Sequence, residues 1–210
     1  TKRRIGYDNG RYDSSWHDEA ASLGEISSNG TTYIKANEYT TTGGVLSTKN
    51  MIWDVNKLNA DALKLSGEDR NGVNSDNYGR YSQTTHLGAG IVADTTTGRI
   101  GDMNLVGSTF AGGDTNGLTI SGNVNVESVV NSYENESKRT NKGFLSSDSR
   151  YVNAHEEENV AGNLQLNGAR IEGNLTGIGS NIVLGENSYV GGKVTTDSRE
   201  LHNSYYEKNR

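Results

Sequence analysis

The stretch GNLQLNGARI, residues 162–171, decides how the rest of the chain is interpreted. A glycine is followed by two apolar residues at alternate positions, then by a second glycine and a further apolar residue. Alternation with a period of two predicts a β-strand with one buried face, and the glycines on either side predict turns. The stretch therefore indicates a short strand whose Leu164 and Leu166 side chains face a core.

The same template occurs at two earlier places in the chain. Residues 101–110 fill every template position, with Met103 and Leu105 at the alternating apolar positions. Residues 24–33 match as well, except that the polar Ser28 stands at one apolar position. A template repeated in register indicates a repeat protein whose units stack on one another.

A polar segment that contains tyrosine precedes each copy of the template, and such segments are expected to lie in loops or hairpins outside the core. These segments are residues 7–12, 77–81 and 131–134, with a fourth that starts at 203. We therefore expect one β-helix fragment of about three repeats in a single domain. The predicted repeats are residues 1–75, 76–130 and 131–202, followed by the start of a fourth at 203–210.

Within the repeats, strand-like pairs recur every 15 to 20 residues, as the step from Leu164/Leu166 to Ile182/Leu184 and that from Met103/Leu105 to Leu118/Ile120 show. Short strands at this spacing, separated by Gly, Asn and Asp, are typical of a solenoid. The predicted fold is all-β: a right-handed parallel β-helix with polar hairpin or loop excursions. A β-sandwich and a β-roll are the alternatives, but a sandwich would show longer alternating strands.

The composition agrees with a thin core and excludes several classes of function. The chain has 210 residues, of which 27 are Gly, 25 are Asn and only 31% are hydrophobic, and it contains no Pro and no Cys. A narrow solenoid interior needs few apolar side chains per coil. The absence of Cys excludes disulfides and thiolate metal sites, and the net charge of −6 argues against a general nucleic-acid binder. No stretch is apolar and long enough for a transmembrane segment.

Tyrosine is the residue type that most suggests a binding surface. The 11 Tyr concentrate in the polar excursions, and exposed Tyr is enriched at interfaces. The alternative is that each ring packs locally on its own hairpin. The candidate partner contacts are Tyr78, Tyr81, Tyr133, Tyr205 and Tyr206.

The sequence indicates no catalytic residue, metal site or cofactor site. The clusters at residues 17–19 and 155–158 combine His with carboxylates, but each is a run of adjacent residues, which favours a solvated strand edge over a metal site. Residues 112–118 resemble a calcium-binding nonapeptide that occurs only once, so a turn is expected there. Sugar cleavage would need paired carboxylates in a cleft. Stacked coils could bring Glu172, Glu186 and Asp197 together, but nothing in the sequence singles them out.

The run KGFLSS at residues 142–147 carries a family resemblance together with its neighbours. It follows NSYENES at residues 131–137 and precedes VAGNLQL at residues 160–166. In this context it resembles a haemagglutinin repeat, of the second, C-terminal class found in filamentous haemagglutinin. The resemblance covers most of residues 75–210 and extends loosely over residues 1–74, although the middle repeat has HLGAG at residues 86–90 in place of the KGFLSS run.

The resemblance implies a piece of a large secreted bacterial exoprotein of the two-partner secretion type, exposed on the cell surface. Such proteins cross the outer membrane unfolded through a dedicated β-barrel transporter and then fold as extended β-helices. In contact-dependent growth-inhibition proteins, this repeat class lies before the C-terminal toxin and engages the envelope of the target cell.

The expected function is thus a non-catalytic shaft and delivery segment. The alternatives are an adhesin module that binds host or neighbouring cells and, less favoured, a β-helix enzyme that degrades polysaccharides.

Overall fold

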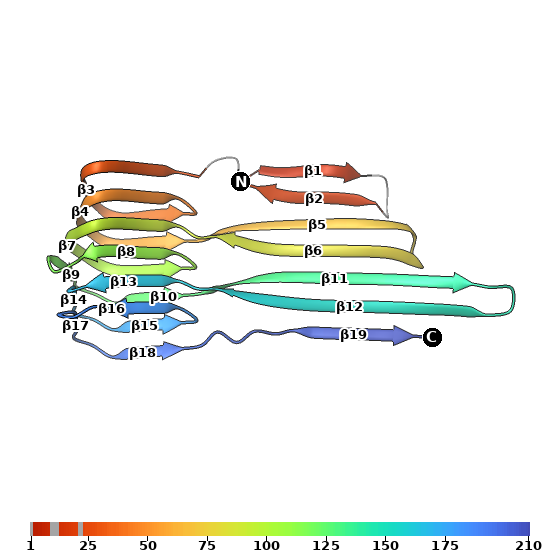
Figure 1. Ribbon diagram of the computed structural model, residues 1–210. Coiled ribbons are helices and arrows are strands. Elements are labelled where there is room, and N and C mark those ends of the chain that lie inside the picture. The colour runs from red at the N-terminus through yellow and green to blue at the C-terminus, as the bar shows by residue number, and fades with distance from the viewer. Residues whose placement is uncertain (1, 9–12, 21–22) are drawn as a thin grey trace.

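The computed structural model describes residues 2–8, 13–20 and 23–210, and the described residues contain β-strands and no helix. The strands form two sheets of different character, one antiparallel and one parallel (Figure 1). Part of the predicted excursion at residues 7–12 lies outside the described residues.

The antiparallel sheet has seven strands whose spatial order follows their order in the chain. They are β1 (Lys2–Asp8), β2 (Ser14–Glu19), β5 (Leu63–Asn74), β6 (Asn77–Leu87), β11 (Val129–Lys142), β12 (Ser147–Val160) and β19 (Ser204–Asn209). The polar excursions expected from the sequence are thus hairpins, together with the single strand β19, that pair with one another. They project to one side of the parallel strands as a single layer (Figure 1).

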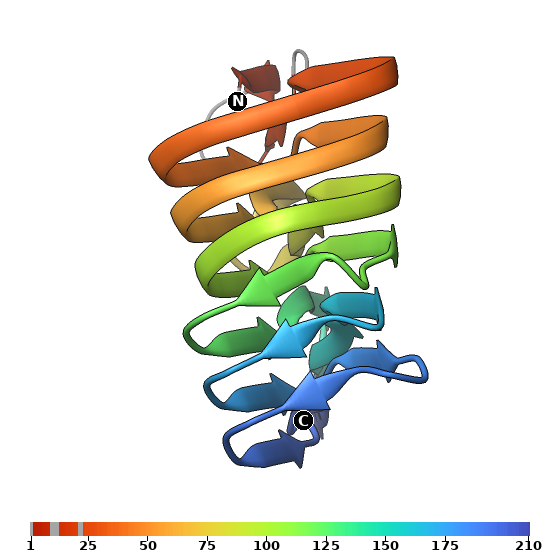
Figure 2. The ribbon, with the colours of Figure 1, turned by 90° about the vertical axis from the view of Figure 1, so that its left-hand side faces the viewer.

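The parallel sheet begins with three long strands, β3 (Glu25–Thr42), β4 (Val45–Asp61) and β7 (Gly90–Val106), which curl around the core (Figure 2). The strands that continue the sheet are short. They are β8 (Thr109–Asp114), β9 (Leu118–Ile120), β10 (Val124–Glu127), β13 (Asn163–Asn167), β14 (Arg170–Ile171), β15 (Leu175–Ile178), β16 (Asn181–Leu184), β17 (Tyr189–Val190) and β18 (Val194–Asp197). The prediction of short strands therefore holds after residue 107 and is wrong for the three long ones. This curled parallel sheet is compatible with a β-helix.

Equivalent apolar side chains of successive turns stack in columns, as the strand registers show. One column contains Ile26, Leu46, Ile91, Phe110, Leu164 and Ile182. A second contains Tyr39, Leu58, Met103, Val124, Leu175 and Val194. Side chains inside the columns are 2% exposed or less, whereas Ile26 and Val194 at opposite ends are 49% and 53% exposed. Each turn is therefore buried only by its neighbours.

The columns correct one part of the sequence interpretation. Met103, Leu105, Leu164 and Leu166 are all buried, as predicted. The first and last copies of the template also share one column, because Ile26 and Leu164 both belong to it. The middle copy does not, since Met103 pairs with Val124 in the second column.

The shorter period is confirmed in one case and wrong in the other. Leu164 pairs with Ile182, 18 residues later, as predicted. Leu118 does not lie above Met103; it pairs with Gly98 on the long strand β7. Because β7 curls, its successive parts pair with the short strands β8, β9 and β10 in turn. A period in the sequence does not show which part of a long strand pairs with which short strand.

Some of the asparagines form ladders on the outside of the turns. The side-chain amide of Asn104 donates to Oδ1 of Asn59 at 3.1 Å, and that of Asn125 donates to Oδ1 of Asn104 at 3.1 Å. These residues are partners in adjacent parallel strands. In-register stacking thus satisfies amide groups on the outside of the same strands that carry apolar side chains inside.

A pair of substitutions in β13 tests which face of the strand is buried. Leu166 is 2% exposed, whereas the neighbouring Gln165 side chain points outward and is exposed. Leu166→Asp should lower the free energy of unfolding by roughly 3–5 kcal/mol because it buries an unpaired charge. Gln165→Asp should be nearly neutral. Urea unfolding followed by circular dichroism compares the two, and equal effects would contradict the register.

A second pair tests the close approach of turns at the long strands. Gly98 has φ +99°, and a Cβ there would overlap the backbone oxygen of Trp53 on the turn above. Gly90, in the same strand, has open space around the corresponding position. Gly98→Ala should destabilise the protein by about 1–3 kcal/mol through backbone strain alone. The overlap of the added Cβ with the Trp53 backbone oxygen should destabilise it further. Gly90→Ala should have a much smaller effect on the unfolding midpoint, and a Gly98→Ala protein as stable as Gly90→Ala would show that β4 and β7 are further apart.

Candidate partner-binding surface

The antiparallel sheet separates the five predicted tyrosines onto two faces, because successive side chains of a strand point to opposite sides. Tyr81 of β6 lies opposite Asn135 of β11, which lies opposite Ala154 of β12, which in turn lies opposite Tyr205 of β19. Tyr133 is two residues before Asn135 and therefore shares this face. The sheet thus brings Tyr81, Tyr133 and Tyr205 together.

Tyr78 and Tyr206 lie on the opposite face. Tyr206 is paired with Asn153, one position along from Ala154, and its ring contacts that of Tyr151 edge-on at 6.1 Å between centroids. Tyr78 donates a hydrogen bond from its hydroxyl to Oε1 of Glu136 at 2.5 Å and is half-buried. The sequence reasoning treated the five tyrosines as one set, but the alternation of the strands divides them.

A shallow hollow of about 340 Å³ lies on the face that carries Tyr81 and Tyr133. Its lining also includes Asn135, Ala154 and Glu156. The small side chain of Ala154 leaves room between larger neighbours, and Tyr205 is its cross-strand partner on the far side. Aromatic rings beside an amide and a carboxylate offer apolar contact together with hydrogen-bonding groups for a polar ligand.

Two of these tyrosines are oriented by neighbouring carboxylates. Tyr205 donates to Oε2 of Glu207 at 2.7 Å, and Arg150 of β12 donates to Oε1 of the same carboxylate at 2.9 Å. The two hydrogen bonds lower the pKa of Glu207 to about 2, with the one from Tyr205 the larger cause. The hydroxyl of Tyr133 lies 3.4 Å from Oε2 of Glu158. The pKa of Tyr133 is raised, mainly by partial burial and secondly by the charge of Glu158. The surface is thus fixed by contacts across and along the strands.

Tyr78 is a structural member of the sheet. Its hydrogen bond to Glu136 is the largest cause of a pKa raised to about 12. The bond crosses from β6 to β11 and therefore joins the two hairpins. The hydroxyl contacts of Tyr133 and Tyr205 stay within one hairpin or one strand, whereas this bond links two hairpins.

The two His-containing clusters lie on strands of the same sheet. His17 contacts Glu19 at 2.9 Å, and His155 contacts Glu157 at 3.0 Å and Glu134 at 3.3 Å. Each His is therefore paired with a carboxylate two residues along its own strand. Within residues 13–20 and 23–210, no group of three or more His, Asp or Glu side chains is arranged to hold a metal ion.

A turn lies within the predicted segment 112–118, at residues 115–117. It joins β8 to β9, and Oδ1 of Asp114 accepts hydrogen bonds from the backbone and the side-chain amide of Asn116 at 3.0 and 2.8 Å. These bonds lower the pKa of Asp114. The carboxylate is thus engaged in holding the turn.

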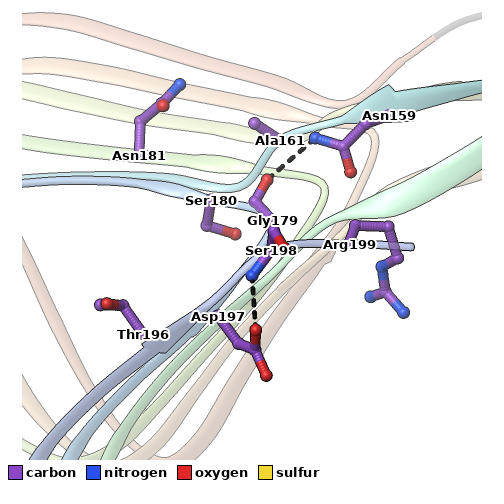
Figure 3. A pocket seen from close by; sticks show the side chains of 9 residues that line it. All are labelled: Asn159, Ala161, Gly179, Ser180, Asn181, Thr196, Asp197, Ser198 and Arg199. Atoms are coloured by element: carbon purple, nitrogen blue, oxygen red, sulfur yellow. Dashed lines mark hydrogen bonds between the residues drawn. The ribbon is translucent and has the colours of Figure 1, made fainter. Parts of the chain in front are cut away.

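A larger hollow of about 730 Å³ lies where the two sheets meet near the C-terminal end of the chain (Figure 3). The Asn159 side chain donates to the carbonyl oxygen of Gly179 at 2.9 Å, and Oδ1 of Asp197 accepts from the backbone N–H of Ser198 at 2.9 Å. The Arg199 guanidinium is directed away from the hollow and donates to Oγ and the carbonyl oxygen of Ser128 at 2.9 and 2.7 Å. The Arg199 hydrogen bonds therefore join the segment that follows β18 to Ser128, which lies between β10 and β11.

The carboxylates considered for sugar cleavage are not gathered in this hollow. Asp197 lines it, but Glu172 and Glu186 do not. Glu172 contacts Arg170 on its own turn at 3.5 Å.

Sequence reasoning missed the residues that complete the tyrosine-bearing hollow, Asn135, Ala154 and Glu156. Their positions two residues apart within β11 and β12 are a signal that they share faces with Tyr133 and with each other. Which strand lies opposite which cannot be obtained from one sequence, because the pairing of β11 with β6 depends on how the hairpins stack.

No family model, no curated protein and no solved structure matches this chain. Within the part of the chain that the structure describes, no helix has the length and apolar character needed to cross a membrane.

The His155–Glu157 pair, on the other face of the antiparallel sheet, gives the sheet a pH dependence of known direction. The hydrogen bond to Glu157 raises the pKa of His155 above its usual 6.5, and the same bond lowers the pKa of Glu157 below its usual 4.5. The contribution of His155 to stability is complete below about pH 6.5 and is lost as pH rises through the raised pKa. That of Glu157 is complete above about pH 4.5 and is lost as pH falls through the lowered pKa. The pair therefore stabilises the sheet most between these values.

Titration of the His155 ring signals by NMR measures this directly. Glu157→Gln should move the pKa of His155 down toward 6.5. Glu156→Gln, which changes a neighbouring carboxylate on the opposite face of the strand, should move it less. An unchanged pKa in Glu157→Gln would show that the hydrogen bond is absent in solution.

Proposed function

We propose that this chain is a non-catalytic repeat segment of a large secreted bacterial surface exoprotein of the two-partner secretion type. In this proposal the curled parallel strands form a right-handed β-helix, and the segment serves as shaft and delivery region in contact-dependent toxin delivery, where it associates with the outer membrane of the target cell. Its partners are the outer-membrane transporter of the parent protein and the target-cell envelope.

The observation that carries the proposal is the regular order of turns and hairpins along the chain. Two turns of parallel strand are followed by one hairpin: β3 and β4 precede β5–β6, and β7 and β8–β10 precede β11–β12. Further units can be added to such a stack without changing the units already present, because each contacts only its neighbours. This arrangement suits an extended shaft, whose task is to span distance.

The family-like motif at residues 142–147 supports the same assignment by its position. It includes the end of β11, the start of β12 and the turn between them, at the tip of the longest hairpin (Figure 1). The sequence also has no Cys. Passage of an unfolded chain through a transporter is easier when no disulfide closes a loop in it.

Cell-surface labelling tests the proposal. Antibodies raised against the purified chain should label intact cells of the producing bacterium, and protease added to intact cells should remove the signal. Recovery of the protein only from the cell interior would contradict the assignment, and so would turnover of a polysaccharide by the purified chain in a broad substrate screen.

An adhesin module is the second candidate, and the hollow beside Tyr81 and Tyr133 is the observation that favours it. In this reading the face that carries Tyr81, Tyr133 and Tyr205 contacts a ligand on host or neighbouring cells. The hollow provides a preformed place for one polar group of that ligand.

Two adjacent residues of β19 provide a matched test of this second candidate. Tyr205 and Tyr206 are 64% and 53% exposed and lie on opposite faces. Tyr205→Ser should weaken binding of the purified chain to cells about tenfold, the effect of losing one well-placed aromatic contact. Tyr206→Ser should bind as the unmodified chain does. Equal binding by both variants, with unchanged circular dichroism, would rule out this face as the contact.

A further inference from the structure

We propose that the turn of the β11–β12 hairpin is a lipid-contacting tip, in which Phe144 and Leu145 enter the surface of a bilayer that contains anionic phospholipid. The basic side chains behind the turn would then lie beside the lipid phosphates. The inference rests on the envelope association proposed above and names the element and the chemistry responsible for it.

Two large apolar side chains at this turn are fully surrounded by solvent. Phe144 is 101% exposed and Leu145 is 93% exposed. The turn itself is closed, since the backbone N–H of Gly143 donates to the carbonyl oxygen of Ser146 at 2.7 Å. A defined turn thus presents the two side chains outward, although burial of such groups is the main favourable term in folding and association.

The two side chains have no protein surface within reach because the hairpin extends past its neighbour (Figure 1). Lys138 pairs with Tyr78, next to the start of β6, and the backbone N–H of Thr140 donates to Oδ1 of Asn77 at 3.0 Å. Strand β11 continues to Lys142, about 13 Å beyond Lys138 at the usual rise of an antiparallel strand. An extended flat surface that approaches this edge of the molecule therefore meets Phe144 and Leu145 first.

The region behind the tip is basic, in contrast to the chain as a whole. Residues 138–150 and 207–210 contain six Lys and Arg and two Asp and Glu, a net side-chain charge of +4 in a chain with a net charge of −6. Asp76 of the neighbouring turn reduces this charge by one through contacts with Lys138 and Lys142 at 3.0 and 3.2 Å. A net positive patch remains directly behind two exposed apolar side chains.

Two arginines of this region lie directly opposite each other on adjacent strands. Arg139 is the direct cross-strand partner of Arg150, an arrangement that destabilises a sheet unless an anion is present. Both line a hollow of about 540 Å³ together with Arg210 and Asp148. Arg150 is also held by Glu207. The guanidinium of Arg139 thus remains available to a phosphate group, which arginine binds in bidentate fashion.

Apolar side chains that insert and basic side chains that attract anionic headgroups are the two contributions that bind a protein to a membrane surface. A water-soluble partner protein would not require the cations to lie behind the apolar tip. An anionic phospholipid surface requires that order, since its phosphates lie outside its acyl chains.

Flotation of vesicles with the full purified chain tests the inference. The chain should bind vesicles of phosphatidylcholine with about one third phosphatidylglycerol, and binding should weaken as salt is raised, because surface attraction is screened. The double variant Phe144→Ser/Leu145→Ser should lose about tenfold or more in affinity with an unchanged unfolding midpoint, because neither side chain packs on the fold. Arg139→Gln should weaken binding to these vesicles and should not change the weaker binding to pure phosphatidylcholine.

Val73→Ser is the matched control, since Val73 is 82% exposed near the turn of the shorter hairpin. It should bind as the unmodified chain does. Binding by the double variant equal to that of the unmodified chain would overturn the inference, and so would binding only to vesicles that carry lipopolysaccharide.

A different result would overturn the lipid inference in favour of contact between copies of the chain. In that case the unmodified chain would not bind vesicles but would self-associate as its concentration rises, and the double variant would not self-associate. If the chain binds target cells but no phospholipid vesicle, the tip inference fails while the proposed function stands. If the chain binds vesicles but the protein is found only inside the producing cell, the proposed function fails while the lipid-contacting property of the tip stands.

Discussion

The structure depends on one constraint, which is that both of its sheets must advance by the same distance along the stack. Neighbouring strands lie about 4.8 Å apart whether they are parallel or antiparallel. Each repeat adds two turns to the parallel sheet and one hairpin of two strands to the antiparallel sheet. The two sheets therefore grow in step, and neither has to stretch or skip a strand. An excursion of one strand or of three would break this match.

The same constraint explains how a chain with so few apolar residues folds. Inside the turns, each apolar side chain is covered by its equivalents above and below, so that a column such as Leu46, Ile91 and Phe110 is buried by its own repetition. On the hairpins, contacts such as those of Tyr78 with Glu136 and of Arg80 with Glu68 at 2.8 Å take the place of a core. The polar composition that would suggest disorder is thus what a thin core with a single-layer sheet requires.

Much of the parallel sheet could be predicted from sequence, because burial has a local signature. The alternation in residues 162–171 correctly indicated that Leu164 and Leu166 are buried. The column to which Met103 belongs could not be predicted, since the long strand β7 carries residues of several columns and its curl is set by the turns above and below. The five candidate tyrosines lie on the polar strands of the antiparallel sheet, yet their division between two faces depends on register, which only the paired strands reveal. The exposure of Phe144 and Leu145 was also out of reach, because it follows from the difference in length between two hairpins.

The direction of the ladders has a mechanical consequence. In both sheets the hydrogen bonds between strands run along the stack, so a force that pulls the two ends of the stack apart acts on the ladders one after another. Bonds loaded in this way open in succession and not all at once. The molecule would consequently lengthen by releasing one layer at a time under tension, with each released layer adding slack equal to its own contour length before the next one is strained.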